Sequence, residues 1–325
     1  RHRKPRFYYT PTTLFDKPMN TKVKGNVAML VSKTFSGFNE NALRYLLPHY
    51  MNAATGVFLR VAFATAFFWG IGACRQHRAT HITRHQKLSL LALGFACIFC
   101  YMFFLLKGLS YTTPVSSSIF ISLQPVVVFI ICLLTGREKA TSLKVIGIII
   151  GVAGAAICVL TQKSSDVASD PALGNLFCAG STIVYSLYLI FSKQLLRNID
   201  SVTVSKWTFL GATLSALPVA LLTGWHAPVL KMSIISAPML VLLFVLIFPS
   251  SVSYLLVDIG LKNLAATVVA LYGSVILIVA TIASYIFGQD HFSWWQILSV
   301  CLIILSMYLV ETEERKTQPT PQGKK

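Results

Sequence analysis

Residues 88–106 read LSLLALGFACIFCYMFFLL, a stretch with no charged side chain. A helix that crosses a bilayer needs about 20 mostly apolar residues. Further stretches of similar character are residues 114–135, 143–161, 235–259, 264–287 and 295–310, and longer but more polar ones are residues 25–47, 52–73, 172–195 and 203–223. The sequence therefore predicts ten transmembrane helices, which leave no room for a separate soluble domain.

The composition excludes an ordinary soluble enzyme and a disordered chain. Of the 325 residues, 55% are hydrophobic and only 12% are charged, whereas soluble domains average about 25% charged residues. Backbone N–H and C=O groups in lipid must form hydrogen bonds within the protein. Separate apolar segments meet this requirement by forming helices. The predicted fold class is an all-α integral membrane protein.

The basic residues are distributed unevenly between the two sides of the predicted bundle. The formal net charge is +17. If the N-terminus is cytoplasmic, the external loops hold only Lys107, Lys163 and Lys231. Three further basic residues fall within spans, namely Lys33, Arg44 and Arg60, and all other Lys and Arg lie on the cytoplasmic side. This positive-inside pattern predicts cytoplasmic N- and C-termini and an even number of spans. It also explains the charge through anionic lipid headgroups, without nucleic acid.

The terminal segments and the cysteines have unremarkable expected roles. Residues 1–23 are expected to form a basic cytoplasmic tail, with Met19 as the native start, and residues 312–325 a disordered cytoplasmic tail.

The cysteines lie in or beside spans, so no disulfide is expected. The cysteine pair at 97 and 100 is expected to pack in the helix. The histidines at 77, 81 and 85 lie among arginines, where a cation is repelled, so no metal and no cofactor is predicted.

An internal repeat links the two halves of the chain. A shift of 152 residues places residues 108–111 (GLSY) on 260–263 (GLKN), and residues 136–139 (GREK) on 288–291 (GQDH). A shift of 149 residues relates the first predicted span to the sixth. The predicted repeats are residues 24–161 and 172–311, joined by an external linker at 162–171. Because each has five spans, the second must be inverted relative to the first, an arrangement typical of secondary transporters.

Several short motifs resemble the EamA-type members of the drug/metabolite transporter superfamily. They are residues 36–39 (SGFN), 45–48 (YLLP), 59–60 (LR), 122–125 (SLQP) and 135–139 (TGREK), together with the Gly-rich stretch 147–154. The resemblance covers about residues 24–311 and implies ten spans, inverted five-helix repeats and a central cavity that opens alternately to each side. Three positions depart from the family pattern: Ser36 replaces a frequent Trp, Leu277 a Pro, and Asp290 a Glu.

Polar side chains inside the first span are the best indicators of a binding site, because charge within a bilayer is costly. Asn39 and Glu40 are expected to line a cavity. Glu40 alternatively forms a neutralising pair with Arg44, at the favourable i,i+4 spacing. Lys33 either belongs to the same face or extends to the cytoplasmic edge.

Further candidates lie in other spans. Arg60 fits an anionic substrate, a pair with Glu40 or a helix cap equally well. Gln124 lies beside Pro125 in the fourth span, and Pro249 should kink the eighth span, with Tyr254 facing the cavity. Asp258 is expected to be a plain helix-end acid. The full set of predicted substrate-binding residues is Asn39, Glu40, Arg60, Gln124, Tyr185, Tyr188, Tyr254 and Tyr272.

The favoured function is a secondary transporter, not an enzyme, that carries a small metabolite by alternating access in a bacterial inner membrane. The expected substrates are amino acids, related metabolites or drugs, exported from the cell, with Glu40 as a candidate proton carrier. The sequence has no P-loop for ATP-driven pumping and no catalytic group of acids and nucleophiles. A membrane-embedded enzyme, a passive channel and a nucleotide-sugar-type carrier are the alternatives.

Overall fold

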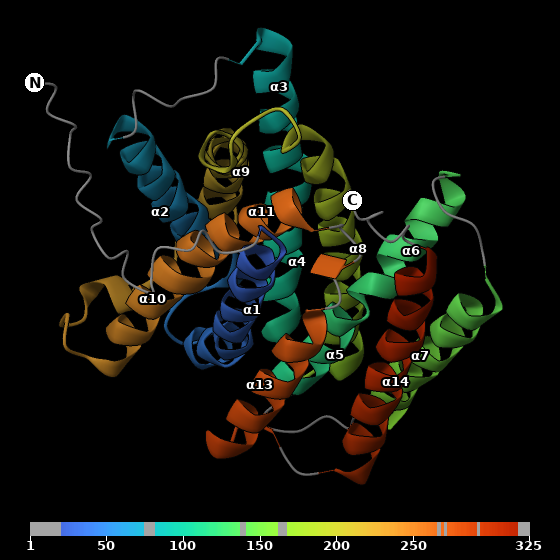
Figure 1. The fold of residues 1–325 in the computed structure, drawn as a ribbon. Helices are drawn as coiled ribbons and strands as arrows, with labels where there is room; N and C mark the ends of the chain where they lie inside the picture. Colours follow the sequence, from blue (N-terminus) through green and yellow to red (C-terminus); the bar gives the residue numbers. More distant parts are fainter. Residues whose placement is uncertain are drawn as a thin grey trace, which may run out of the picture.

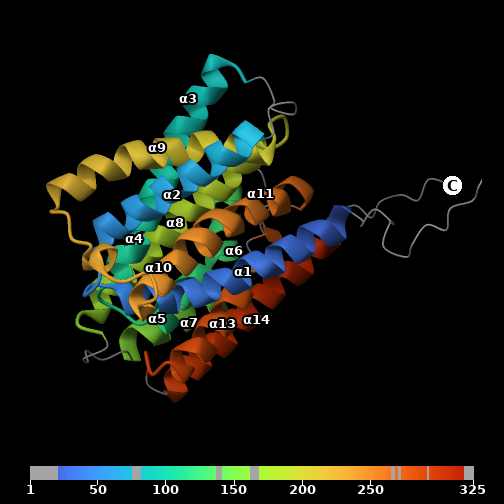
Figure 2. The same cartoon turned by 90° about the vertical axis from the view of Figure 1, so that its left-hand side faces the viewer.

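The computed structural model describes residues 21–74, 82–136, 141–161, 168–264, 268–269, 272–290 and 293–317. These residues form helices and contain no strand. Residues 1–20 and 318–325 of the predicted tails, the histidines at 77 and 81, and most of the linker at 162–171 lie outside the described residues. Residues 21–23 and 312–317, which were predicted as tail, are instead helical, because α1 begins at Thr21 and α14 continues to Thr317. Figures 1 and 2 show the helices packed side by side around α1 (Thr21–Leu46).

Six helical segments of the described chain are long and apolar enough to cross a membrane. They are α2 (Ala53–Cys74), Arg84–Leu109, Pro114–Leu134, α8 (Pro171–Leu195), α9 (Ser201–Leu222) and Ala237–Asn263. Shorter apolar helices occur within α7 (Ser142–Thr161), α13 (Gly273–Ile286) and α14 (Trp294–Thr317). Helix α1 has 26 residues, but its polar side chains lower its mean hydropathy.

Two of the six segments change helix type midway. Arg84–Leu109 comprises α3 (Arg84–Leu93), the π-helix η2 (Gly94–Phe99) and α4 (Cys100–Leu109). Ala237–Asn263 comprises α10 (Ala237–Ile247), the π-helix η4 (Phe248–Val252) and α11 (Ser253–Asn263). Pro249 lies within η4, where its missing N–H breaks the regular hydrogen-bond ladder, so the predicted irregularity of this span is present.

The segment Pro114–Leu134 is broken at Leu123 into α5 (Pro114–Ser122) and α6 (Gln124–Leu134). Pro125 follows the break at the start of α6. Capping groups define several helix starts: Thr113 caps α5, Asp170 caps α8 and Asp200 caps α9 through side chains that accept backbone N–H groups. A short 3-10 helix, η3 (Pro228–Lys231), lies between α9 and α10.

Helix packing follows a regular scheme. Helix α1 packs against α11 and α13, while α8 packs against α4, α5 and α6. Helix α2 packs against α9, α5 against α13, and α7 against α14. In Figure 2 the N-terminal end of α1 and the C-terminal end of α14 lie at the same end of the bundle, as expected for an even number of crossings.

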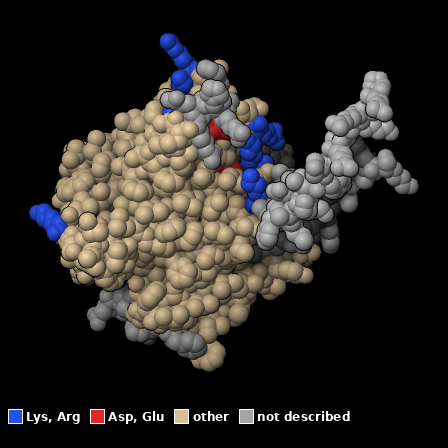
Figure 3. All heavy atoms as spheres, turned by 60° about the vertical axis from the view of Figure 1, so that its left-hand side comes forward, with Lys and Arg blue, Asp and Glu red and all other residues tan. Residues whose placement is uncertain are grey.

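Close backbone contacts hold α9 against the segment that contains η2. A Cβ added to Gly94 would lie 1.8 Å from the Thr208 carbonyl oxygen, and one added to Gly211 would lie 2.2 Å from the Leu91 carbonyl oxygen. Small residues permit such close approach between helices in a membrane. The outer surface is different in character: Figure 3 shows a face that is mostly uncharged, with Lys and Arg at its margins.

Candidate functional site

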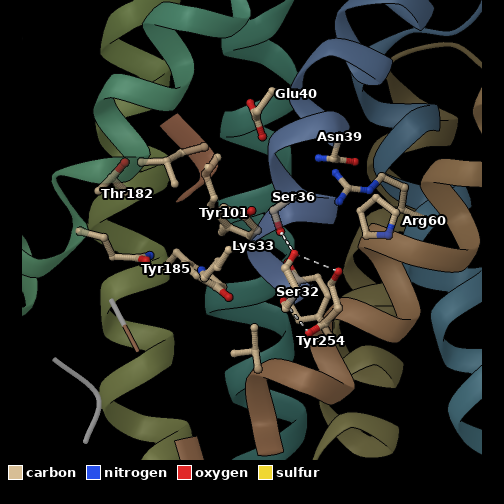
Figure 4. A pocket seen from close by; sticks show the side chains of 16 residues that line it. Ser32, Lys33, Ser36, Asn39, Glu40, Arg60, Tyr101, Thr182, Tyr185 and Tyr254 are labelled. Atoms are coloured by element: carbon tan, nitrogen blue, oxygen red, sulfur yellow. Dashed lines mark hydrogen bonds between the residues drawn. The ribbon is translucent and has the colours of Figure 1, made fainter. Parts of the chain in front are cut away.

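A polar cavity lies at the centre of the bundle. It is lined by residues of α1, α2, α4, α5, α6, α8, η4, α11 and α13, so both halves of the chain contribute to it. Its volume is about 30 Å³, which is room for roughly two water molecules. Figure 4 shows the side chains that face this space. In this conformation the cavity has no room for a larger organic molecule.

One face of α1 forms the longest wall of the cavity. Ser32, Lys33, Ser36, Asn39 and Glu40 all line it, because spacings of three and four residues place side chains on one side of a helix. Ser32 Oγ donates to the Ser253 carbonyl at 3.0 Å, and Ser253 Oγ donates to the Ser32 carbonyl at 3.3 Å. These reciprocal bonds hold α1 against α11.

The two cations of the first two helices are buried. Lys33 is only 2% exposed, and its Nζ lies 5.5 Å from the centre of the Tyr185 ring. It is therefore part of the cavity wall and does not extend to the cytoplasmic edge. Arg60 is 1% exposed and donates through Nε to Ser250 Oγ at 2.8 Å. Its Nη1 atom is buried with no hydrogen-bond partner in the described structure.

The carboxylate of Glu40 accepts a hydrogen bond from α5. Ser117 Oγ donates to Glu40 Oε2 at 2.8 Å, and the glutamate side chain is buried. Arg44, the alternative partner of Glu40, donates through Nη1 to the Leu109 carbonyl at 3.1 Å. The acid thus lines the cavity while it links α1 to α5.

The amides supply further buried polar atoms. Gln124 is 1% exposed, and neither its Nε2 nor its Oε1 has a hydrogen-bond partner among the described residues. Asn39 Oδ1 is likewise buried without a hydrogen-bond partner among the described residues. An unsatisfied buried polar group costs about 1–3 kcal/mol. Such groups facing one cavity indicate a site that is completed by a ligand or by water.

Three tyrosines form the aromatic part of the wall. The ring centres of Tyr101 and Tyr185 are 4.5 Å apart, and those of Tyr185 and Tyr254 are 6.5 Å apart with the planes nearly perpendicular, at 88°. Tyr188 stacks behind Tyr185 at 5.6 Å. Figure 4 shows Tyr101, Tyr185 and Tyr254 around Ser32 and Lys33.

A second buried acid lies behind the tyrosines. Asp258 is fully buried and is not an exposed helix-end acid, because α8 and α9 cover it. Tyr188 Oη donates to its Oδ1 at 3.3 Å, and Ser205 Oγ donates to its Oδ2. The sequence placed Asp258 close to a helix end but gave no indication that two other helices pack over that end.

Six of the eight predicted site residues line the cavity: Asn39, Glu40, Arg60, Gln124, Tyr185 and Tyr254. Tyr188 lies one ring behind the wall. Tyr272 is half-buried against the hydrophobic core and is not among the residues that line this cavity. The predicted set omits the other ten lining residues: Ser32, Lys33, Ser36, Tyr101, Ile121, Thr182, Pro249, Ser253, Val257 and Ile276.

The repeat register relates several of the missed residues to other residues of the lining. A shift of 149 positions pairs Lys33 with Thr182, and Ser36 with Tyr185. A shift of 152 positions pairs Tyr101 with Ser253, and Gln124 with Ile276. All eight line the cavity. The cavity is thus built from equivalent positions of the two halves.

The described residues contain no group of three or more His, Cys, Asp or Glu side chains that could hold a metal ion. Among the described cysteines, those at 74, 97, 100 and 301 are free thiols.

Curated relatives cover most of the chain. A Bacillus subtilis (strain 168) protein named "Uncharacterized transporter YyaM" is 22% identical over 86% of this chain and 91% of its own length. Another from the same organism, "Uncharacterized transporter YetK", is 25% identical over 80% of this chain and 78% of its own length. An "Uncharacterized transporter" of Archaeoglobus fulgidus is 24% identical over 70% of this chain and 77% of its own length.

The fold is also shared with a protein of known crystal structure. The two superpose with a TM-score of 0.63 at 17% identity, over 92% of this chain and 99% of the other. The model of the EamA-like transporter family matches twice, at residues 23–160 and 172–312. These two matches span most of the sequence, and the chain belongs to the EamA-like transporter family.

Proposed function

We propose that this membrane transporter is a secondary carrier that moves a small metabolite by alternating access through the central cavity. The observation that carries the proposal is the cavity itself, which is buried, contains unpartnered polar atoms and is lined by both halves of the chain. Secondary transporters bind substrates at such repeat interfaces near the bilayer midplane. Amino acids, related metabolites and drugs, exported across a bacterial inner membrane, are the proposed cargo.

The proposed architecture is ten spans in two inverted five-helix repeats, with α1, α7, α13 and α14 added to the six long apolar segments. The packing scheme supports this proposal. Under the expected repeat α1 corresponds to α8, and α11 corresponds to α4. The α1–α11 contact is therefore matched by the α8–α4 contact, and α2–α9 and α7–α14 are contacts between equivalent helices.

In the proposed mechanism, the two halves rock about the cavity and expose it to each side in turn. Substrate contacts are proposed for the six predicted residues that line the cavity, while the same role for Tyr188 and Tyr272 stays a prediction. Glu40 is the proposed coupling group. The other charged or titratable groups of the described wall are Lys33, Arg60, Tyr101, Tyr185 and Tyr254, and Asp258 lies behind the tyrosines.

The test is uptake into proteoliposomes of pooled labelled amino acids and metabolites, with and without a proton gradient. We expect saturable, gradient-dependent uptake by the wild type and loss of the gradient dependence in Glu40→Gln. Asp170→Asn is the matched control, because it makes the same change outside the cavity and Asn also caps helices well. Non-saturable flux would favour a channel, and gradient-dependent uptake retained by Glu40→Gln would remove the coupling role.

A further inference from the structure

The cavity has an excess of positive charge. Its described lining contains two cations, Lys33 and Arg60, and one acid, Glu40. With Glu40 ionised the lining carries one surplus positive charge, and with Glu40 protonated it carries two. Asp258 is not among the lining residues, and its two oxygens accept from Tyr188 and Ser205, so this acid forms no direct contact at the wall with a cation or a substrate.

Among the lining residues, Arg60 has the clearest unsatisfied hydrogen-bond donor. Ser250 satisfies only its Nε atom, and Nη1 is buried without a partner in the part of the chain that the structure describes. A buried charge needs a paired, hydrogen-bonded counter-ion to be stable. Gln124 offers a second unpartnered donor through Nε2, and Figure 4 shows Arg60 and Lys33 in walls of the same space.

We infer that the substrate is a small organic monoanion whose carboxylate binds Arg60 and Lys33. The inference rests on the proposed function and narrows the cargo proposed there, because it selects anionic metabolites over zwitterionic amino acids. A monoanion neutralises the surplus charge when Glu40 is ionised, whereas a zwitterion leaves it in place and a cation increases it. Arg is suited to carboxylate recognition, because its planar group forms short, charge-assisted hydrogen bonds.

The aromatic wall argues against a cationic substrate. Tyrosine rings attract cations over their faces, but Lys33 already approaches the ring of Tyr185 at 5.5 Å. A cationic substrate would have to displace this ammonium group within a buried space. The amide oxygens of Gln124 and Asn39, which lack partners among the described groups, instead suit a hydroxyl or N–H on the uncharged part of the anion.

The experiment compares three labelled pools that share carbon skeletons and differ in charge, each taken up by proteoliposomes. The anionic pool holds lactate, 2-hydroxyisovalerate and 3-phenyllactate, which carry the hydroxyl donor. The zwitterionic pool holds alanine, valine and phenylalanine, and the cationic pool holds their amides. We expect saturable, protein-dependent uptake from the anionic pool at least tenfold faster than from the other two.

Variants then test the binding residues. Arg60→Gln and Lys33→Gln should each reduce anion uptake at least tenfold, and Arg60→Lys should retain part of it because the charge remains. Lys206→Gln is the matched control, since Lys206 lies outside the cavity with its Nζ 3.7 Å from the Trp69 ring centre. Size-exclusion chromatography of each variant establishes that it is folded before its transport is compared.

The outcomes separate the inference from the proposed function. Saturable uptake only from the zwitterionic or cationic pool overturns the anion inference and leaves a carrier. Anion uptake that folded Arg60→Gln and Lys33→Gln variants retain overturns the assignment of the binding residues. No saturable uptake from any pool by folded wild-type protein overturns the carrier and the inference together.

Discussion

At the scale of single residues, the contact between Arg60 and Ser250 joins two helices that are far apart in sequence. The hydroxyl lies in η4, where the helix is widened, and it meets the guanidinium from α2 at 2.8 Å. The serine fixes one edge of the guanidinium group and leaves Nη1 toward the cavity. Ser250 is therefore a positioning residue, which acts on a substrate only through Arg60.

Replacement of Ser250 by Ala should lower stability by about 1.5–3 kcal/mol, because a buried charged group loses a hydrogen bond. Substrate affinity should fall as well, since Arg60 is no longer held. The measurements are unfolding in detergent and the concentration dependence of uptake. Ser251→Ala is the control, because Ser251 only donates to the Leu246 carbonyl of its own segment; equal effects of the two variants would contradict the positioning role.

At the scale of elements, the two π-helices occupy related places in the two halves. Residues 94–99 shifted by 152 positions become 246–251, which overlap η4 at 248–252. Gly136 and Gly288, also 152 positions apart, have φ angles of 67° and 64°. Gly accepts these angles without strain, so the same helix-ending turn follows α6 and α13. Local geometry therefore repeats where the sequence matches are sparse.

The glycine contacts of α9 yield a stability prediction. Gly211→Ala should destabilise the protein by about 3 kcal/mol, since overpacking against a backbone carbonyl that cannot rotate away is costly. Gly70→Ala, on an exposed face of α2 with no atom within 4 Å of the added Cβ, should be neutral or slightly stabilising. Thermal unfolding in detergent measures both, and a neutral Gly211→Ala would disprove the tight α9 contact.

At the scale of the whole molecule, the cavity exists because the two halves meet. Nine of its described lining residues come from α1, α2, α4, α5 and α6, and seven come from α8, η4, α11 and α13. Its small volume corresponds to a conformation closed around the site. Under the proposed alternating-access mechanism, helices of different halves separate to admit a substrate to this cavity.

The orientation of the molecule can be tested with single cysteines placed in a cysteine-free background. Ser233 and Asn198 are both exposed, in the connections after α9 and after α8. An impermeant maleimide should label Ser233→Cys in intact cells, and Asn198→Cys only after permeabilisation, because the basic residues favour the cytoplasmic side. The reverse pattern would invert the proposed topology.

The sequence by itself determined the membrane class, the six long apolar helical segments and the doubled organisation. These properties depend on local apolar length, on charge placement and on register, all of which are written along the chain. It also identified Asn39, Glu40 and Arg60, since charged and amide groups inside a span are conspicuous whatever their partners are.

Only the tertiary structure decided which polar groups meet. Tyr101 and Thr182 look like ordinary residues of apolar helices until rotation and packing bring them to one cavity. Asp258 becomes buried because α8 and α9 cover it, and Arg60 finds a partner 190 positions away. Tyr272, an equally plausible aromatic, faces the core instead. Partner choice depends on how separate helices pack against one another, and that is a property of the whole bundle, not of any one segment.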